Sequence, residues 1–98
     1  MPTYEALPRF TTDLNRLTPE QRRTFHRVIT RAFVPDLRAG GHFRPGLRIK
    51  RVRCLPGVYE LTWSGGGRAT WSYGTERIRG AQHIVWRRIG GHDIFGGP

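Results

Sequence analysis

Apolar residues recur at helical spacing through the first third of the chain. After an extended segment around Pro8, Phe10, Leu14 and Leu17 predict about two turns of helix over residues 10–17. A longer stripe follows at the i, i+3, i+4, i+7 and i+8 positions, formed by Phe25, Val28, Ile29, Ala32 and Phe33. Because each stripe covers one side of its helix, we expect two N-terminal helices packed against a common core.

The second helix carries signals at both ends. Thr18 suits the N-cap position, Pro19 the first helical position, and Gln21 the place where a capping box needs Glu or Gln. Pro35 has no backbone N–H and disfavours helical conformation in the residue before it. The helix is therefore predicted to end just beyond Phe33.

From residue 47 onward, the period changes to the alternation typical of strands. Strands are predicted over 47–50, 58–63, 68–73 and 83–89, with a bulge near Arg51 and Val52. Pro56-Gly57 predicts a turn, residues 64–67 a hairpin turn, and residues 39–46 and 74–82 longer loops. The predicted fold class is α+β, with two N-terminal helices packed on one face of a four-stranded, mainly antiparallel sheet.

Alternation also assigns the hairpin residues to faces of the sheet. The face beneath the helices receives Tyr59, Leu61, Trp63, Ala69, Trp71 and Tyr73. The opposite, polar face receives Glu60, Thr62, Arg68, Thr70 and Ser72. By the same parity, the first strand adds Arg48 and Lys50, and the last strand adds either His83 and Arg87 or Arg88. Such a face is suited to holding a polyanion and moving protons.

Length and composition narrow the functional classes. The 98 residues predict one domain over 1–98, and 17 Lys and Arg against 7 Asp and Glu give a net charge of +10, which favours an anionic partner. Cys54 is the only cysteine, so no intramolecular disulfide or thiolate zinc site is possible, and the four histidines form no ligand-like pair. We expect a cytoplasmic protein with no metal, no cofactor and no membrane association.

Several segments follow one another in the order and spacing of a known family. They are Leu47–Val52, Pro56–Leu61, the strand-opening pair Gly67-Arg68 and the terminal His92-Asp93-Ile94-Phe95. Together these segments resemble the RelE/ParE superfamily of type II toxins, and the likeness spans nearly the whole chain. The order and spacing carry it, rather than any single motif.

The resemblance implies a small toxin that a cognate antitoxin protein neutralises. RelE-like members cut mRNA in the ribosomal A site, whereas ParE-like members poison DNA gyrase. We expect the first activity, a metal-independent and ribosome-dependent mRNA endoribonuclease with the ribosome and mRNA as partners. A gyrase inhibitor without catalysis and a plain basic RNA-binding domain stay open as alternatives.

The nuclease branch requires a base, an acid and positive charge, because the RNA 2′-OH attacks the adjacent phosphate. By resemblance, Arg68 matches the strand-opening arginine that holds the scissile phosphate. RelE has lysines where this chain has Glu60 and Thr62, and a tyrosine where it has Phe95. Other nuclease members use Glu and His, which makes Glu60 the expected base and His92 the expected acid.

The same residues also admit structural roles. Glu60 is suited to a cross-strand ion pair with Arg68, and His92 beside Asp93 is suited to a turn.

A further set of cations is expected to contact the RNA backbone. The strand region supplies Arg48, Lys50, Arg51, Arg53, Arg87 and Arg88. The second helix supplies Arg23, Arg27 and Arg31, which are four positions apart and opposite the apolar stripe. Like charges at this spacing cost roughly a few tenths of a kcal/mol per pair, so the uncompensated triple favours an acidic partner.

Overall fold

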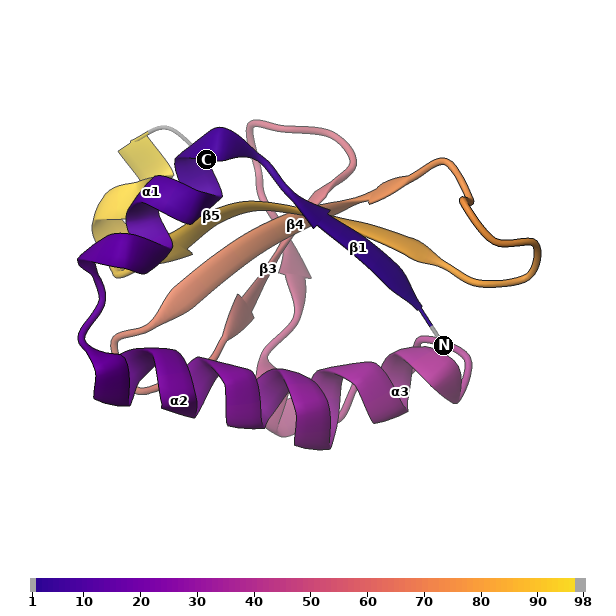
Figure 1. Cartoon of the computed structure of the whole chain (residues 1–98), viewed down its shortest axis with the longest axis horizontal. Coiled ribbons are helices and arrows are strands. Elements are labelled where there is room, and N and C mark those ends of the chain that lie inside the picture. The colour runs from indigo at the N-terminus through magenta and orange to yellow at the C-terminus, as the bar shows by residue number, and fades with distance from the viewer. Residues whose placement is uncertain (1, 97–98) are drawn as a thin grey trace.

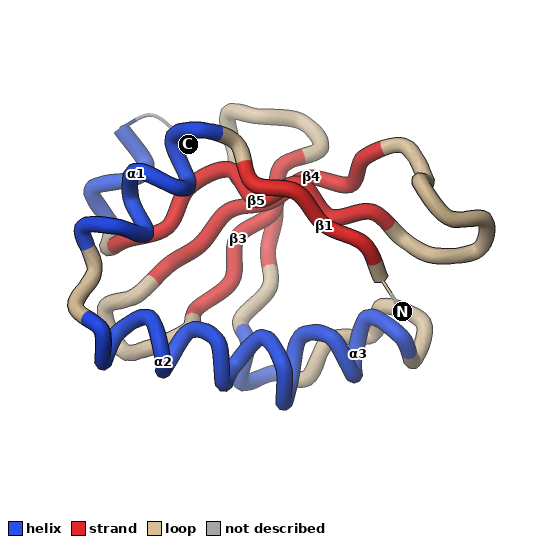
Figure 2. The backbone as a smooth tube through the Cα atoms, in the orientation of Figure 1, coloured by secondary structure: helices blue, strands red, loops and turns tan. Residues whose placement is uncertain are grey.

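The computed structural model describes residues 2–96, which fold around one mixed β-sheet (Figure 1). The five strands lie in the order β1-β5-β4-β3-β2, and are β1 (Thr3–Ala6), β2 (Lys50–Arg51), β3 (Val58–Thr62), β4 (Arg68–Gly74) and β5 (His83–Gly90). The helical elements are α1 (Pro8–Arg16), α2 (Pro19–Val28), the π-helical turn η1 (Ile29–Phe33), α3 (Val34–Arg38) and the 3₁₀ turns η2 (Pro45–Leu47) and η3 (His92–Gly96). In Figure 2, α2 runs through η1 into α3 as one continuous rod along the sheet.

The start of α2 is confirmed and its predicted end is wrong. The Thr18 hydroxyl accepts from the Gln21 backbone N–H at 3.1 Å, and the Gln21 side chain accepts from the Thr18 N–H at 2.9 Å, which completes the capping box. At the other end, the Val34 N–H donates to the carbonyl of Ile29, five residues back. After this π turn a new helical segment, α3, begins at Val34. Pro35 therefore lies in the first turn of α3, where a missing N–H is tolerated.

The β3–β4 hairpin forms as predicted, and so do its faces. Tyr59 lies opposite Trp71, and Leu61 lies opposite Ala69. Leu61, Ala69 and Trp71 are fully buried on the side of the helices, where Phe33 of η1 packs edge-on against Trp71 at 5.0 Å between ring centroids. The core is therefore an aromatic layer between the rod and the sheet.

The predicted first strand over 47–50 is largely wrong. Residues Pro45–Leu47 form the 3₁₀ turn η2, and Arg48 follows in the left-handed conformation with φ 49°. A non-glycine residue in this conformation breaks the strand path. Only Lys50–Arg51 pairs with β3, and Arg48 does not belong to the polar sheet face.

The predicted bulge lies elsewhere, in the β4–β5 pair. Thr70 faces Arg88 whereas Trp71 faces Trp86, so Arg87 is an extra residue in β5. The extra residue resets the alternation. His83 and Arg88 consequently share one face, although strict alternation allows only one of them there.

The sequence pattern does not predict the fifth strand, β1, which lies parallel to β5 at the sheet edge. Buried His83 fastens it, because the Thr3 hydroxyl lies 2.8 Å from Nδ1 and Glu5 Oε1 lies 3.0 Å from Nε2. Arg77 also donates to Glu5 at 3.2 Å. The hydrogen bond from His83, together with Arg77, holds the pKa of Glu5 below its ordinary value, against a smaller opposing effect of burial. The α+β fold class is confirmed, with a five-stranded sheet instead of four strands.

Candidate functional site

The sheet face turned away from the rod, here called the distal face, holds the first two predicted catalytic residues. One cross-strand row consists of Lys50, Glu60, Thr70 and Arg88. The neighbouring row consists of Thr62, Arg68 and Gly90. The prediction that Glu60 and Arg68 share a face is therefore confirmed, and they lie in adjacent rows.

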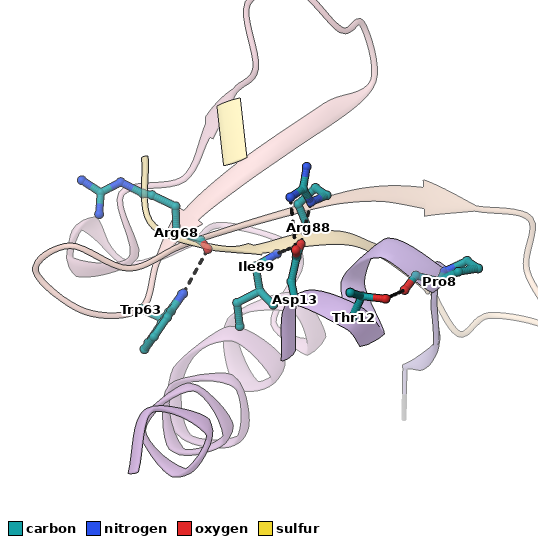
Figure 3. Close-up of polar contacts among 7 residues, drawn as sticks. All are labelled: Pro8, Thr12, Asp13, Trp63, Arg68, Arg88 and Ile89. Atoms are coloured by element: carbon teal, nitrogen blue, oxygen red, sulfur yellow. Dashed lines mark hydrogen bonds and ion pairs between the residues drawn. The ribbon is translucent and has the colours of Figure 1, made fainter. Parts of the chain in front are cut away.

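Arg68 stands at the first position of β4, directly after the glycine-rich turn over 64–67. Its Nη1 donates to the carbonyl of Gly67 at 2.9 Å and, more weakly, to that of Gly65 at 3.4 Å, while its own carbonyl accepts from the Trp63 indole at 3.1 Å. In Figure 3 the side chain extends away from Arg88. The turn thus anchors one nitrogen of a guanidinium that has five N–H donors, which leaves donors to hold a phosphate.

Glu60 lies further along the same face and is only 8% exposed. Lys50 lies opposite it on β2, with Nζ 3.8 Å from Glu60 Oε1. The sequence also allowed an ion pair between Glu60 and Arg68. Within residues 2–96, Glu60 pairs with Lys50 and not with Arg68. The carboxylate can act as a base only if its exposure to substrate increases.

His92 opens η3 and is exposed at the same end of the distal face as Arg68. A Cβ placed on Gly91 would lie 3.5 Å from the carbonyl of Gly66, so η3 begins beside the turn that anchors Arg68. The His92 ring meets the Phe95 ring edge-on at 5.6 Å. The structure therefore brings Arg68 and His92 to one end of the face, with Glu60 one row further in.

Contrary to the prediction, the distal face is not polar throughout. Ile94 of η3 is only 2% exposed. A Cβ placed on Gly90 would meet its Cγ2 at 2.9 Å, and Gly90 lies opposite Arg68 in the sheet. Ile94 therefore lies on the distal face, against the row that contains Arg68.

The other predicted RNA-binding cations have different surroundings. Lys50 is exposed on the distal face, whereas Arg51 lies opposite Tyr59 and so belongs to the helix side, and Arg53 is exposed in the turn after β2. Arg48 is exposed next to η2, and Arg87 is half-buried at the bulge. These cations do not form one surface.

Arg88 has a structural partner that the sequence did not reveal. Its guanidinium donates from Nε and Nη2 to the carboxylate of Asp13 in α1, which also accepts from the backbone N–H of Ile89 (Figure 3). Burial alone raises the pKa of Asp13, but the hydrogen bonds from Arg88 and Ile89 bring it below the ordinary value. Arg88 thus has a structural role in this ion pair, and its role in RNA binding stays a prediction.

The three helix arginines occupy the predicted surface. Arg23, Arg27 and Arg31 are exposed along α2 and η1, and none takes part in the ion pairs recorded for residues 2–96. They lie on the rod, away from the distal face.

A large apolar groove was not anticipated. It has a volume of about 1080 Å³ and lies between the rod on one side and β1, α1 and β5 on the other. Apolar side chains such as Phe25, Ile29 and Trp86 line it, and its basic lining residues are Arg22, His26 and Arg38, with no Asp or Glu among the described lining residues. The sequence signal for this groove is the apolar stripe of the second helix. Phe25 and Ile29 of that stripe line the groove and are not fully buried in the core.

Within residues 2–96, no three His, Cys, Asp or Glu side chains are grouped so that they could hold a metal ion. No helix in the same range is long and apolar enough to cross a membrane.

Comparison with known proteins identifies the fold. No family model and no curated protein sequence matches the chain. Among solved structures, YafQ from E. coli is 9% identical and covers 99% of this chain and 100% of its own, with a TM-score of 0.65. A toxin from Helicobacter pylori is 13% identical, with coverage of 95% and 97% and a TM-score of 0.64.

A chain of the RelBE2 toxin–antitoxin complex from Mycobacterium tuberculosis is also similar. It is 20% identical, with coverage of 94% and 100% and a TM-score of 0.53. YafQ itself has been solved in complex with the antitoxin DinJ. The structures of YafQ with DinJ and of RelBE2 are thus toxin–antitoxin complexes, and this chain has the fold of these neighbours over nearly its whole length.

Proposed function

We propose that this protein is the toxin of a toxin–antitoxin pair and that it cleaves mRNA on the ribosome without a metal ion. The observation that carries the proposal is one end of the distal face, where the turn that anchors Arg68 lies beside the start of η3, which carries the exposed His92, within a RelE-like fold. The net charge of +10 supports a polyanionic substrate.

The proposed reaction is an intramolecular phosphoryl transfer within the RNA. Glu60 takes the proton of the 2′-OH as its oxygen forms a bond to the adjacent phosphorus. The bond from phosphorus to the 5′ oxygen breaks, and protonated His92 gives its proton to that oxygen. The products are a 2′,3′-cyclic phosphate and a 5′-hydroxyl, and Arg68 stabilises the negative charge that develops on the phosphoryl oxygens.

The distribution of cations suggests how the substrate is held. Lys50 is exposed on the distal face beside Glu60, in reach of the RNA backbone that crosses it. Arg23, Arg27 and Arg31 lie on another surface, suited to the phosphates of folded ribosomal RNA. Two separate basic surfaces fit a protein that docks on an RNA particle and acts on a second strand.

The apolar groove is the surface best suited to an antitoxin. A groove with basic groups and no described carboxylate at its lining is complementary to an amphipathic segment whose apolar side enters it and whose polar side is acidic. Exposed Tyr4 of β1 and Arg38 of α3 stand on opposite sides of it. We therefore place the antitoxin on the groove side of the sheet, away from Arg68.

One observation favours a second function, a gyrase poison without catalysis. Glu60 is nearly buried and lies beside Lys50, so the predicted base is not exposed in this conformation. A toxin that acts only by binding needs no base.

Expression of the chain without an antitoxin distinguishes these functions. The nuclease proposal predicts growth arrest with cleaved transcripts in primer extension, and loss of both effects in Arg68→Ala. Growth arrest with intact transcripts and gyrase-linked DNA breaks would instead establish the gyrase function. Normal growth at a verified protein level would contradict both.

A further inference from the structure

Thr70 combines complete burial with a hydroxyl that has no partner. Its side chain is 0% exposed, and Oγ1 makes no hydrogen bond to any described residue. Leaving a buried hydroxyl unsatisfied costs stability, and valine would fill the same space without that cost. Buried polar groups without a hydrogen-bond partner are rare in stable cores, and functional sites are one place where they are expected.

The neighbours of Thr70 are the candidate site residues. Glu60 lies directly opposite on β3, and Arg88 lies directly opposite on β5. Side chains opposite each other on adjacent strands have Cβ atoms about 4.5 to 5.5 Å apart. Arg68 is two positions earlier in the same strand and points to the same face.

Ile94 lies on this face over the row next to that of Thr70. It stands against Gly90, which is two positions after Arg88 on β5 and opposite Arg68 on β4. η3 follows β5 through Gly90 and Gly91, two residues with little resistance to backbone rotation. Displacing η3 about these glycines would uncover the face next to Thr70 and Glu60.

We propose that the Thr70 hydroxyl is a substrate-binding group of this site, donating a hydrogen bond to a phosphate oxygen of RNA once η3 has lifted Ile94 away. This inference rests on the proposed RNA cleavage. A phosphate is the favoured ligand because two cations lie on the same face: Lys50, which is exposed and only 3.8 Å from Glu60, and Arg68, whose turn contacts use one nitrogen. Arg88 is held by Asp13 and serves as a fixed neighbour.

The decisive test measures RNA binding and stability in the same variants. The probe is a bacterial ribosome carrying an mRNA with 2′-fluoro ribose, which lacks the attacking hydroxyl, and ribosomes without mRNA provide the reference. Thr70→Val should weaken binding to the mRNA-carrying ribosome by about 10- to 100-fold, the worth of a hydrogen bond to a charged group. It should leave binding to the reference ribosome unchanged and should not lower Tm.

Three further variants complete the test. Thr70→Ser keeps the hydroxyl and should restore binding. Thr24→Val is a matched control, because the Thr24 hydroxyl bonds the Glu20 carbonyl within α2, and it should bind like wild type. Ile94→Ala removes the side chain that must be displaced and should strengthen binding.

The outcomes separate this inference from the proposed function. If wild type binds the mRNA-carrying ribosome and Thr70→Val binds it equally well, the Thr70 role is wrong while RNA cleavage can still hold. A lowered Tm with unchanged binding would show a purely structural hydroxyl. If mRNA adds nothing to wild-type binding, both proposals fail. An Ile94→Ala affinity at or below wild type would overturn the covering role of η3.

Discussion

Asp13 and Arg88 form a nearly buried ion pair between α1 and the last strand, and their side chains are 8% and 14% exposed. Asp13 also accepts the backbone N–H of Ile89 at 3.2 Å, so one carboxylate fixes both a side chain and the strand that carries it. This pair orients the distal face, because Arg88 lies in the same cross-strand row as Thr70 and Glu60.

Removing the charge of Asp13 should therefore destabilise the fold. Asp13→Asn removes the carboxylate charge that Arg88 is hydrogen-bonded to in a poorly hydrated position, for which we expect a loss of about 3 kcal/mol in the free energy of unfolding. Urea denaturation measures it. Glu20→Gln, an exposed change in the first turn of α2, is the control and should stay within about 0.5 kcal/mol of wild type. Equal effects of the two changes would show that the ion pair contributes nothing.

Acid stability should depend on a second carboxylate, Asp36. Hydrogen bonds from the Arg44 side chain and backbone hold its pKa at about 2, against an ordinary value of 3.8. Because the folded-state pKa is depressed, the stabilisation is complete above pH about 4 and is lost as the pH falls towards about 2. The urea midpoint of Asp36→Asn should then change less steeply over this window than that of wild type. Parallel pH profiles would contradict this.

His92 should affect chemistry and leave docking intact. If it protonates the leaving 5′ oxygen, His92→Gln should slow single-turnover cleavage by about 10² to 10⁴, with ribosome affinity near the wild-type value. Phe95→Tyr adds a hydroxyl at the position where the resemblance to RelE implies a tyrosine, and it should raise the rate or leave it unchanged. Wild-type cleavage by His92→Gln would make His92 a turn residue, and the acid would have to be sought elsewhere.

The helix arginines should govern the salt dependence of ribosome binding. Each phosphate contact contributes about −0.7 to the slope of log K against log[salt] on single-stranded nucleic acid. Changing Arg23, Arg27 and Arg31 together to Gln should make the slope shallower by about 2, without loss of helix content in circular dichroism, because all three are exposed. An unchanged slope would remove these residues from the RNA interface.

Local sequence signals predicted the elements that local interactions determine. Thr18 and Gln21 sit three residues apart and cap α2 with their own side chains, and the alternation in residues 58–73 fixed the register of one hairpin. Such features need no knowledge of distant segments.

The missed features depend on distant segments or on backbone details without a local pattern. Strand β1 pairs with β5 some 80 positions away, and Asp13 meets Arg88 across a similar separation. The π turn before Pro35 and the left-handed Arg48 are backbone adjustments to packing and to a turn, which hydrophobic spacing does not encode. The same holds for Ile94, whose place on the distal face follows only from the turn after Gly90.

The chemistry of the cut ends tests the central claim most directly. Purified chain is mixed with ribosomes that carry a defined mRNA, and the termini of the released fragments are determined. Attack by the RNA 2′-OH predicts a 2′,3′-cyclic phosphate on one fragment and a 5′-hydroxyl on the other, and no fragments with Arg68→Ala. A 5′-phosphate would instead require attack by water, and an intact mRNA in the presence of bound wild-type chain would contradict the nuclease account altogether.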